Sequence, residues 1–122
     1  LMKVKEEVPL VSESAGMREV LIEMTSKHLG TTGVVGAEGK LVGVVTDGDL
    51  RRHLDQKSKD FFDQRAVDLM TLLPKTIGQQ ELVGKAIHIM EKHQITSLFI
   101  TDENAYPVGI IHLHDLIRHK VI

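Results

Sequence analysis

The sequence contains the same unit twice. Residues 43–53 read GVVTDGDLRRH, and residues 109–119, which lie 66 positions further on, read GIIHLHDLIRH. In both stretches a β-branched apolar run ends at a short segment with helical spacing. The apolar stripe of a predicted helix recurs at the same interval, as Met17, Val20, Leu21 and Met24 and then as Val83, Ala86, Ile87 and Met90. The repeat predicts two copies of one supersecondary unit.

Each copy predicts the same order of elements, β-α-β-β-α. In the first copy the apolar pattern indicates a strand, an amphipathic helix, a two-stranded hairpin and a closing helix, over residues 9–11, 15–28, 33–35 with 41–46, and 47–54. The second copy begins with a short leading helix over residues 66–70. Its remaining elements are predicted over residues 74–77, the helix that carries the second stripe, 98–100 with 107–111, and 112–120.

The copies are predicted to differ in one hairpin. Residues 93–97 match residues 28–32 at an interval of 65, whereas the strands after the hairpin loops match at 66. One extra residue is therefore predicted in the second hairpin loop, over 101–106, relative to the first, over 37–40. We assign residues 1–55 to a first copy that lacks its N-terminal part, 56–65 to a linker, and 66–122 to the second copy. Phe61 and Phe62 are expected to pin the linker to the core. Since neither copy can bury its sheet alone, we expect an α+β fold with the copies packed about a pseudo-two-fold axis.

Composition excludes several classes of protein. A net charge of −2 gives no electrostatic reason to expect a nucleic-acid partner. The absence of cysteine excludes disulfides and thiolate metal sites. No apolar run approaches the roughly 18 residues of a membrane span, and no signal peptide is visible. We therefore expect a cytoplasmic protein.

The junction of strand and closing helix is the candidate site in each copy. A helix N-terminus has unsatisfied backbone N–H groups that favour an anion. Thr46 adds a hydroxyl there, and Asp49 adds a carboxylate able to hold a sugar diol. Asp115 keeps the place of Asp49, but His112 replaces Thr46. Helix N-capping is the alternative role for both aspartates.

The other candidate residues have open alternatives. Arg52 and Arg118 follow the aspartates by three residues, where they either reach a ligand anion or lie in solvent or an interface. Four hydroxyl residues near the strand starts either line the ligand cleft expected at this junction or cap the strands; they are Thr31, Thr32, Thr96 and Ser97. His112 and His114 would share a face only on a strand, and no third ligand is evident, so no metal site is predicted. No glycine-rich phosphate loop or catalytic constellation is present, so we expect no catalysis by this chain.

The two units, the Asp-Leu-Met of residues 68–70 and the Gly-to-Asp pattern of residues 43–49 resemble a pair of cystathionine-β-synthase (CBS) domains, also called a Bateman module. Residues 46–52, 95–97 and 112–118 are similar to the C-terminal module of bacterial D-arabinose 5-phosphate isomerases. In that family a sugar-isomerase (SIS) domain comes first and carries the chemistry. The resemblance implies that this chain is the regulatory part and that CBS pairs associate as a homodimer.

The resemblance also implies a nucleotide-type ligand. It places the aspartates on ribose hydroxyls and Thr46 on a phosphate or the ribose, while His112 makes the second site different. An AMP- or ATP-type nucleotide is one expected ligand. The other is CMP-activated keto-deoxyoctulosonate, the end product of a lipopolysaccharide or capsule pathway; no cofactor is required. The alternatives are an assembly module without a ligand, and a module that contributes His112, His114 and Asp115 to the isomerase active site.

Overall fold

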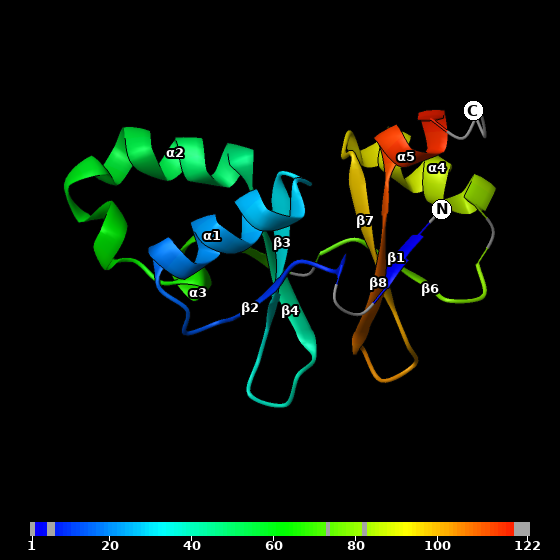
Figure 1. The fold of residues 1–122 in the computed structure, drawn as a ribbon, viewed down its shortest axis with the longest axis horizontal. Helices are drawn as coiled ribbons and strands as arrows, with labels where there is room; N and C mark the ends of the chain where they lie inside the picture. The colour runs from blue at the N-terminus through cyan, green and yellow to red at the C-terminus, as the bar shows by residue number, and fades with distance from the viewer. Residues whose placement is uncertain (1, 5–6, 73, 82, 119–122) are drawn as a thin grey trace. The chain divides into compact units, whose positions relative to one another are not determined.

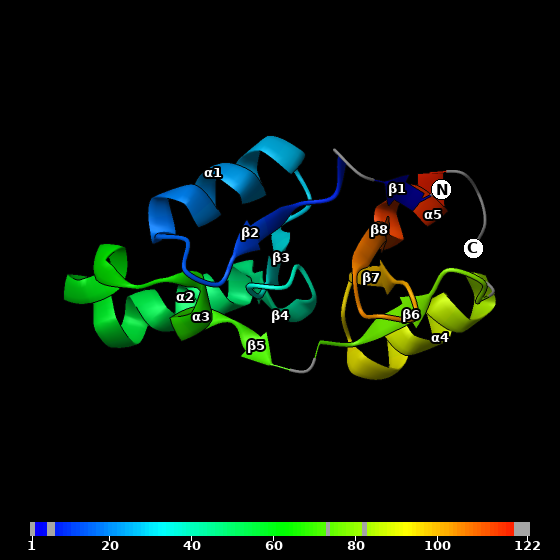
Figure 2. The ribbon, with the colours of Figure 1, turned by 90° about the horizontal axis from the view of Figure 1, so that it is seen from below.

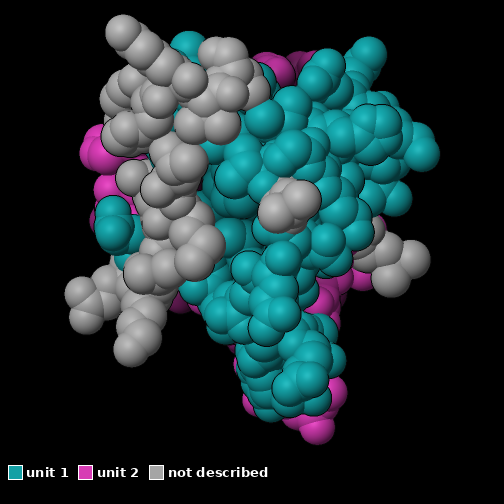
Figure 3. All heavy atoms as spheres, turned by 90° about the vertical axis from the view of Figure 1, so that its right-hand side faces the viewer, with its two compact units in different colours: residues 1–8, 75–122 teal, residues 9–74 magenta. Residues whose placement is uncertain are grey.

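The computed structural model describes residues 2–4, 7–72, 74–81 and 83–118 (Figure 1). The chain divides into two compact units, shown in separate colours in Figure 3. Unit 1 comprises Leu1–Val8 with Lys75–Ile122, and unit 2 comprises Pro9–Pro74. Each unit is a sheet with helices packed on it, which confirms the α+β prediction.

Unit 2 is built on a sheet of strand order β2-β3-β4-β5. Its strands are β2 (Leu10–Ser12), β3 (Thr31–Val35), β4 (Leu41–Thr46) and β5 (Thr71–Leu72). β2 pairs with β3 in parallel, and the other neighbours are antiparallel. The helices are α1 (Met17–Lys27), α2 (Asp47–Lys57), the 3-10 helix η2 (Ser58–Asp63) and α3 (Ala66–Leu69).

The core of unit 2 uses the predicted stripe. Met17, Val20 and Met24 lie on one side of α1 because they are spaced by three or four residues. They pack in one cluster with Val34 and Val45 from the hairpin. The same cluster includes three residues from the segment that follows α2, namely Phe61, Ala66 and Leu69.

Unit 1 repeats this plan with strand order β1-β8-β7-β6. Its strands are β1 (Met2–Val4), β6 (Thr76–Gly78), β7 (Ser97–Thr101) and β8 (Pro107–His112), and its helices are α4 (Val83–His93) and α5 (Leu113–Arg118). β6 and β7 are parallel, as β2 and β3 are. The core residues are Ile77, Ala86, Met90, Leu98, Ile100, Ile111 and Leu116.

The edge strands β1 and β5 do not join the sheet of the sequence copy to which they belong. β1 lies at the start of the first copy but pairs antiparallel with β8, and β5 lies near the start of the second copy but pairs antiparallel with β4. Figure 2 shows β5 beside β4 and β1 beside β8. Unit 1 therefore contains one edge strand of the first sequence copy, β1, and unit 2 contains one edge strand of the second, β5. We call this the exchange of edge strands. Sequence reasoning missed both strands, because each is short and lacks an alternating pattern.

The predicted interval of 65 is wrong. Thr31 pairs with Thr46, and Ser97 pairs with His112, which is the same pairing 66 residues on. The left-handed residues after the two long helices, His28 and Gln94, are also 66 apart. Both hairpin loops have five residues, 36–40 and 102–106, so the second loop is not longer. Two adjacent hydroxyl residues stand near each strand start, Thr31–Thr32 and Thr96–Ser97, and they align at an interval of 65. The strand pairing shows that Thr31 corresponds to Ser97 instead.

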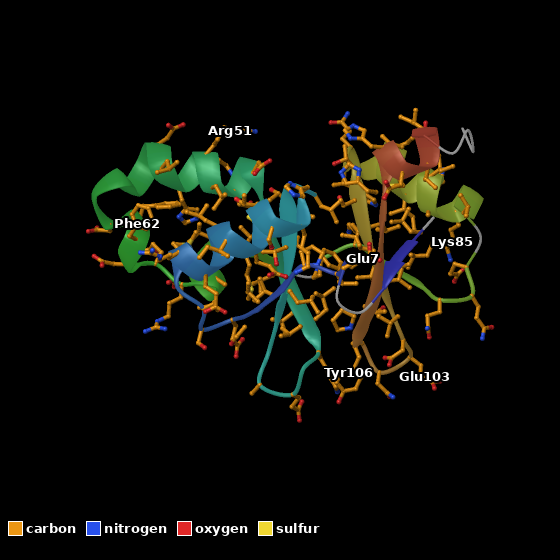
Figure 4. The ribbon with its side chains drawn as sticks, in the orientation of Figure 1. Glu7, Arg51, Phe62, Lys85, Glu103 and Tyr106 are labelled. Atoms are coloured by element: carbon orange, nitrogen blue, oxygen red, sulfur yellow. The ribbon has the colours of Figure 1, made fainter. Side chains whose placement is uncertain are left out.

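Residues 56–63 of the predicted linker are helical. α2 runs to Lys57, three residues beyond its predicted end, and η2 follows at once. Phe61 is buried at 3% exposure, as predicted, but Phe62 is 70% exposed and projects from η2 (Figure 4). The two rings meet edge to face at 5.1 Å. Of the two phenylalanines, Phe61 packs in the core cluster of unit 2 and Phe62 does not.

Candidate functional site

In unit 2 the candidate site forms where β4 runs into α2. The Asp49 carboxylate is buried, and its Oδ2 accepts hydrogen bonds from the Thr46 backbone N–H at 2.9 Å and the Thr46 hydroxyl at 3.1 Å. The Asp49 backbone N–H in turn donates to Thr46 Oγ1 at 3.3 Å. This reciprocal pattern is that of a capping box, so Thr46 and Asp49 carry out the helix-capping role.

The second oxygen of Asp49 has different partners. Oδ1 accepts hydrogen bonds from the Arg52 guanidinium and, at 3.3 Å, from the Thr71 hydroxyl. The Arg52 side chain is 64% exposed, whereas the Asp49 side chain is 5% exposed. Oδ1 therefore lies on the outer side of the site, in contact with the exposed Arg52 side chain and with the Thr71 hydroxyl of β5.

Thr71 is the residue that sequence reasoning missed. It lies 22 positions after Asp49, beyond α3, and reaches the site because β5 pairs with β4 at Val44. Thr71 could be predicted from the strand register, but only if the pairing of β5 with β4 were already known.

In unit 1 the equivalent junction joins β8 to α5. His112 and Asp115 are both buried, at 8% exposure each. The His112 Nδ1 accepts a hydrogen bond from the His114 backbone N–H at 3.1 Å, and the two rings lie 4.7 Å apart. The Nδ1 lone pair is therefore used by a backbone N–H of the same junction.

Ser97 lies beside this junction, since it pairs with His112 across β7 and β8. Its hydroxyl oxygen is buried and has no hydrogen-bond partner within the described part of the chain. Buried polar atoms are rarely left unpaired, so this oxygen favours a ligand-contacting role for Ser97. Thr31, the equivalent residue in unit 2, instead donates to the Val45 carbonyl at 3.2 Å.

The remaining candidates are less closely associated with the sites. The Thr96 side chain is exposed, and its carbonyl accepts from the Leu113 N–H at 2.8 Å. The Thr32 hydroxyl donates to the Gly33 carbonyl, so it has a structural partner. Arg118 ends α5, and its side chain lies outside the described residues.

The histidines do not form a metal centre with other ligating side chains in the part of the chain that the structure describes. Among the residues that the structure describes, no group of three or more metal-ligating side chains gathers. The pKa of His93, at the end of α4, is lowered from 6.5 by desolvation and then by the positive charges of Lys75 and Lys92. None of the described helices is long and apolar enough to cross a membrane.

The fold and the doubled strand-to-helix junction define a tandem repeat module. A family model of the CBS domain matches residues 3–56 and again residues 66–121. The chain belongs to the CBS domain family and carries the domain as a pair.

Two relatives give a more specific similarity. The chain is 40% identical to the arabinose 5-phosphate isomerase KdsD of Pseudomonas aeruginosa, over 100% of this chain and 37% of the relative. It is 38% identical to the KdsD of Francisella tularensis, over 97% of this chain and 36% of the relative. The chain thus spans little more than a third of the length of these relatives.

A solved structure gives the same fold. CBSX2 from Arabidopsis thaliana, crystallised in complex with AMP, superimposes with a TM-score of 0.81 and covers 98% of this chain and 92% of its own. The sequences are 21% identical, so the likeness shows the fold alone.

Proposed function

We propose that this chain is the regulatory, ligand-sensing CBS pair of a cytoplasmic sugar-phosphate isomerase of the arabinose 5-phosphate type. The observation that carries the proposal is the alignment of the whole chain with about a third of such isomerases, at 38–40% identity. The remaining length of those relatives leaves room for a catalytic SIS domain. The product of the parent enzyme would feed lipopolysaccharide or capsule synthesis.

The ligand of this module is proposed to be a nucleotide or nucleotide-sugar. A buried carboxylate at the start of a helix can accept two hydrogen bonds from a ribose diol, while nearby N–H groups and the helix dipole favour a phosphate. In unit 2 a diol would replace Arg52 and Thr71 on Asp49 Oδ1 and leave the cap on Oδ2 intact. AMP- and ATP-type nucleotides and CMP-activated keto-deoxyoctulosonate all carry this diol.

A thermal-shift screen tests the proposal directly. A ligand present at about 100 times its Kd stabilises the folded chain by roughly 2.7 kcal/mol, which raises the melting temperature by about 5 °C or more for a domain of this size. AMP, ATP and CMP-activated keto-deoxyoctulosonate are the test ligands, and the matching 2′-deoxynucleotides are the controls that lack the diol. Equal shifts with ribose and deoxyribose ligands, or none with either, would reject the ligand-sensing role.

The chain alone is expected to lack isomerase activity, because the described residues offer no catalytic constellation beyond the candidate sites. Purified chain incubated with arabinose 5-phosphate should release no ribulose 5-phosphate. Detectable turnover would contradict this. In the longer enzyme, loss of activity in His112→Ala without loss of nucleotide binding would favour a direct contribution to the active site.

A role in assembly is the second candidate, because large apolar side chains are exposed on the helices, namely Ile22 on α1, Leu54 on α2 and Ile117 on α5. We propose a homodimer of CBS pairs formed through such helices. Sedimentation at high micromolar concentration should detect the dimer, and Ile22→Glu should weaken it more than Arg18→Glu on the same helix. A chain that stays monomeric would remove this candidate.

A further inference from the structure

All acceptor positions of the Asp49 carboxylate are already used in this structure. A carboxylate accepts about four hydrogen bonds, two at each oxygen. Oδ2 accepts from the Thr46 backbone N–H and from the Thr46 hydroxyl. Oδ1 accepts from the Arg52 guanidinium and from the Thr71 hydroxyl. A ribose diol can therefore bind Asp49 only by displacing donors that are already there.

The two carboxylate oxygens differ in how readily they release their donors. The Thr46 donors belong to the capping box that begins α2, so losing them would cost the helix its cap. The donors on Oδ1 come from side chains that water can solvate, since Thr71 is exposed and the Arg52 side chain is 64% exposed. A diol is therefore expected to take Oδ1 and to release Arg52 and Thr71.

Releasing Arg52 has an electrostatic cost. The Asp49 side chain is only 5% exposed, so water screens its negative charge poorly. The ion pair with Arg52 compensates that charge, and the neutral hydroxyls of a diol cannot do so. A ligand phosphate bound nearby would add further negative charge. Diol and phosphate are therefore bound together most favourably when a cation lies between the phosphate and the carboxylate.

The Arg52 guanidinium already lies beside the place that favours a phosphate. While Nη2 bonds to Asp49 Oδ1, Nη1 lies 3.4 Å from the point where a Cβ atom on Gly48 would stand. The Thr46 hydroxyl oxygen is 3.6 Å from the same point. Gly48 is in the first turn of α2, whose N–H groups and dipole favour an anion. Because a guanidinium carries five N–H donors in a planar fork, it can exchange a carboxylate oxygen for phosphate oxygens within the site.

We propose that Arg52 makes the site of unit 2 selective for a ligand that carries a ribose diol and a phosphate together. The diol takes Asp49 Oδ1, and the released guanidinium binds the phosphate of the same ligand. A nucleoside displaces Arg52 without offering it a new anion, and a 2′-deoxynucleotide leaves Arg52 on Asp49. The inference rests on the proposed function, since it needs a nucleotide-type ligand at this site.

Calorimetry with adenosine, AMP and 2′-deoxy-AMP tests the proposal. The titrations use the Asp115→Ala chain, so that the site of unit 2 is measured without that of unit 1. In this background Arg52→Ala should weaken AMP binding about tenfold or more, the usual effect of losing a charge-assisted hydrogen bond. The same change should strengthen adenosine binding, because the diol no longer competes with the guanidinium. Binding of 2′-deoxy-AMP should change little.

Two further variants separate this role from a general effect of charge or folding. Arg52→Lys keeps the positive charge without the planar fork, so its AMP affinity should lie between those of the parent chain and Arg52→Ala. Arg51→Ala removes a positive charge from the same helix, where the side chain points outward (Figure 4). Because Arg51→Ala leaves the four donors of Asp49 in place, adenosine binding should be unchanged in it.

Opposite shifts for AMP and adenosine are the expected result, because a purely structural defect in Arg52→Ala would weaken both ligands together. An unchanged ratio of the AMP and adenosine affinities, or a loss of both, would overturn the proposal. Binding that disappears for all three ligands in the Asp115→Ala chain but not in the wild type would place the ligand in unit 1 and also overturn it. A wild-type chain that binds none of the three would instead reject the proposed nucleotide ligand, and this inference with it.

Discussion

Phe61→Ala is expected to lower the free energy of unfolding by about 3–5 kcal/mol, the usual cost of removing a buried phenylalanine. The Phe61 side chain is 3% exposed and packs in the core of unit 2 with Ala66 and Leu69. Alanine would leave a cavity that the short elements η2 and α3 cannot refill without losing their own contacts. Small domains have a total stability of roughly 5–15 kcal/mol, so this loss is a large fraction of it.

Phe62→Ala is the matched control, because the residue is adjacent, chemically identical and 70% exposed. Surface substitutions usually change stability by less than about 0.5 kcal/mol. The chain has no tryptophan, so urea unfolding is best followed by circular dichroism. Equal midpoints for the two variants would show that η2 does not anchor to the core as described.

The two candidate sites are expected to bind AMP unequally, with the site at His112 about tenfold tighter than the site at Thr46. A hydrogen bond from a charged group contributes about 1.5–3 kcal/mol, against about 1 kcal/mol from a neutral hydroxyl. In the unliganded arrangement His112 Nδ1 accepts from the His114 N–H. A protonated ring must give up that bond, and a ligand phosphate compensates for its loss. Tight binding should therefore weaken as the pH is raised and the imidazolium loses its proton.

Calorimetry on single variants separates the sites. Asp115→Ala and His112→Ala should remove or weaken the tighter event, and Asp49→Ala the weaker one. Arg52→Ala removes a hydrogen-bond partner of Asp49 Oδ1. Arg51→Ala is the control for this variant, because Arg51 lies on the same helix and points outward (Figure 4). Two identical binding events in the wild type, or an Asp115→Ala protein that binds as the wild type does, would contradict the prediction.

The sequence predicted the elements that have a strong apolar period. The stripe from Met17 to Met24 and its copy from Val83 to Met90 became α1 and α4, and both hairpins formed where the β-branched runs lie. The period carries this information because a helix or strand must turn its apolar side to the core. The edge strands β1 and β5 have only three and two residues, and their place depends on a partner far away in the chain.

The candidate site was predictable in part for the same reason. Thr46 and Asp49 are three residues apart at a helix start, so local geometry brings them together. Thr71 joins them only through the pairing of β5 with β4, which no local pattern encodes. The hydrogen bond that His112 Nδ1 accepts likewise depends on the direction of the His114 backbone N–H, which the residue types alone do not specify.

The exchange of edge strands also determines where the chain can be divided. A cut between residues 56 and 65 separates the two sequence copies. The first fragment would then contain β1, which pairs with β8 of the second, and the second would contain β5, which pairs with β4 of the first. The fragments would each expose an unpaired sheet edge and would regain their hydrogen bonds only by reassociating. The pair, rather than the single CBS repeat, is therefore the smallest portion of this polypeptide that completes its own sheets.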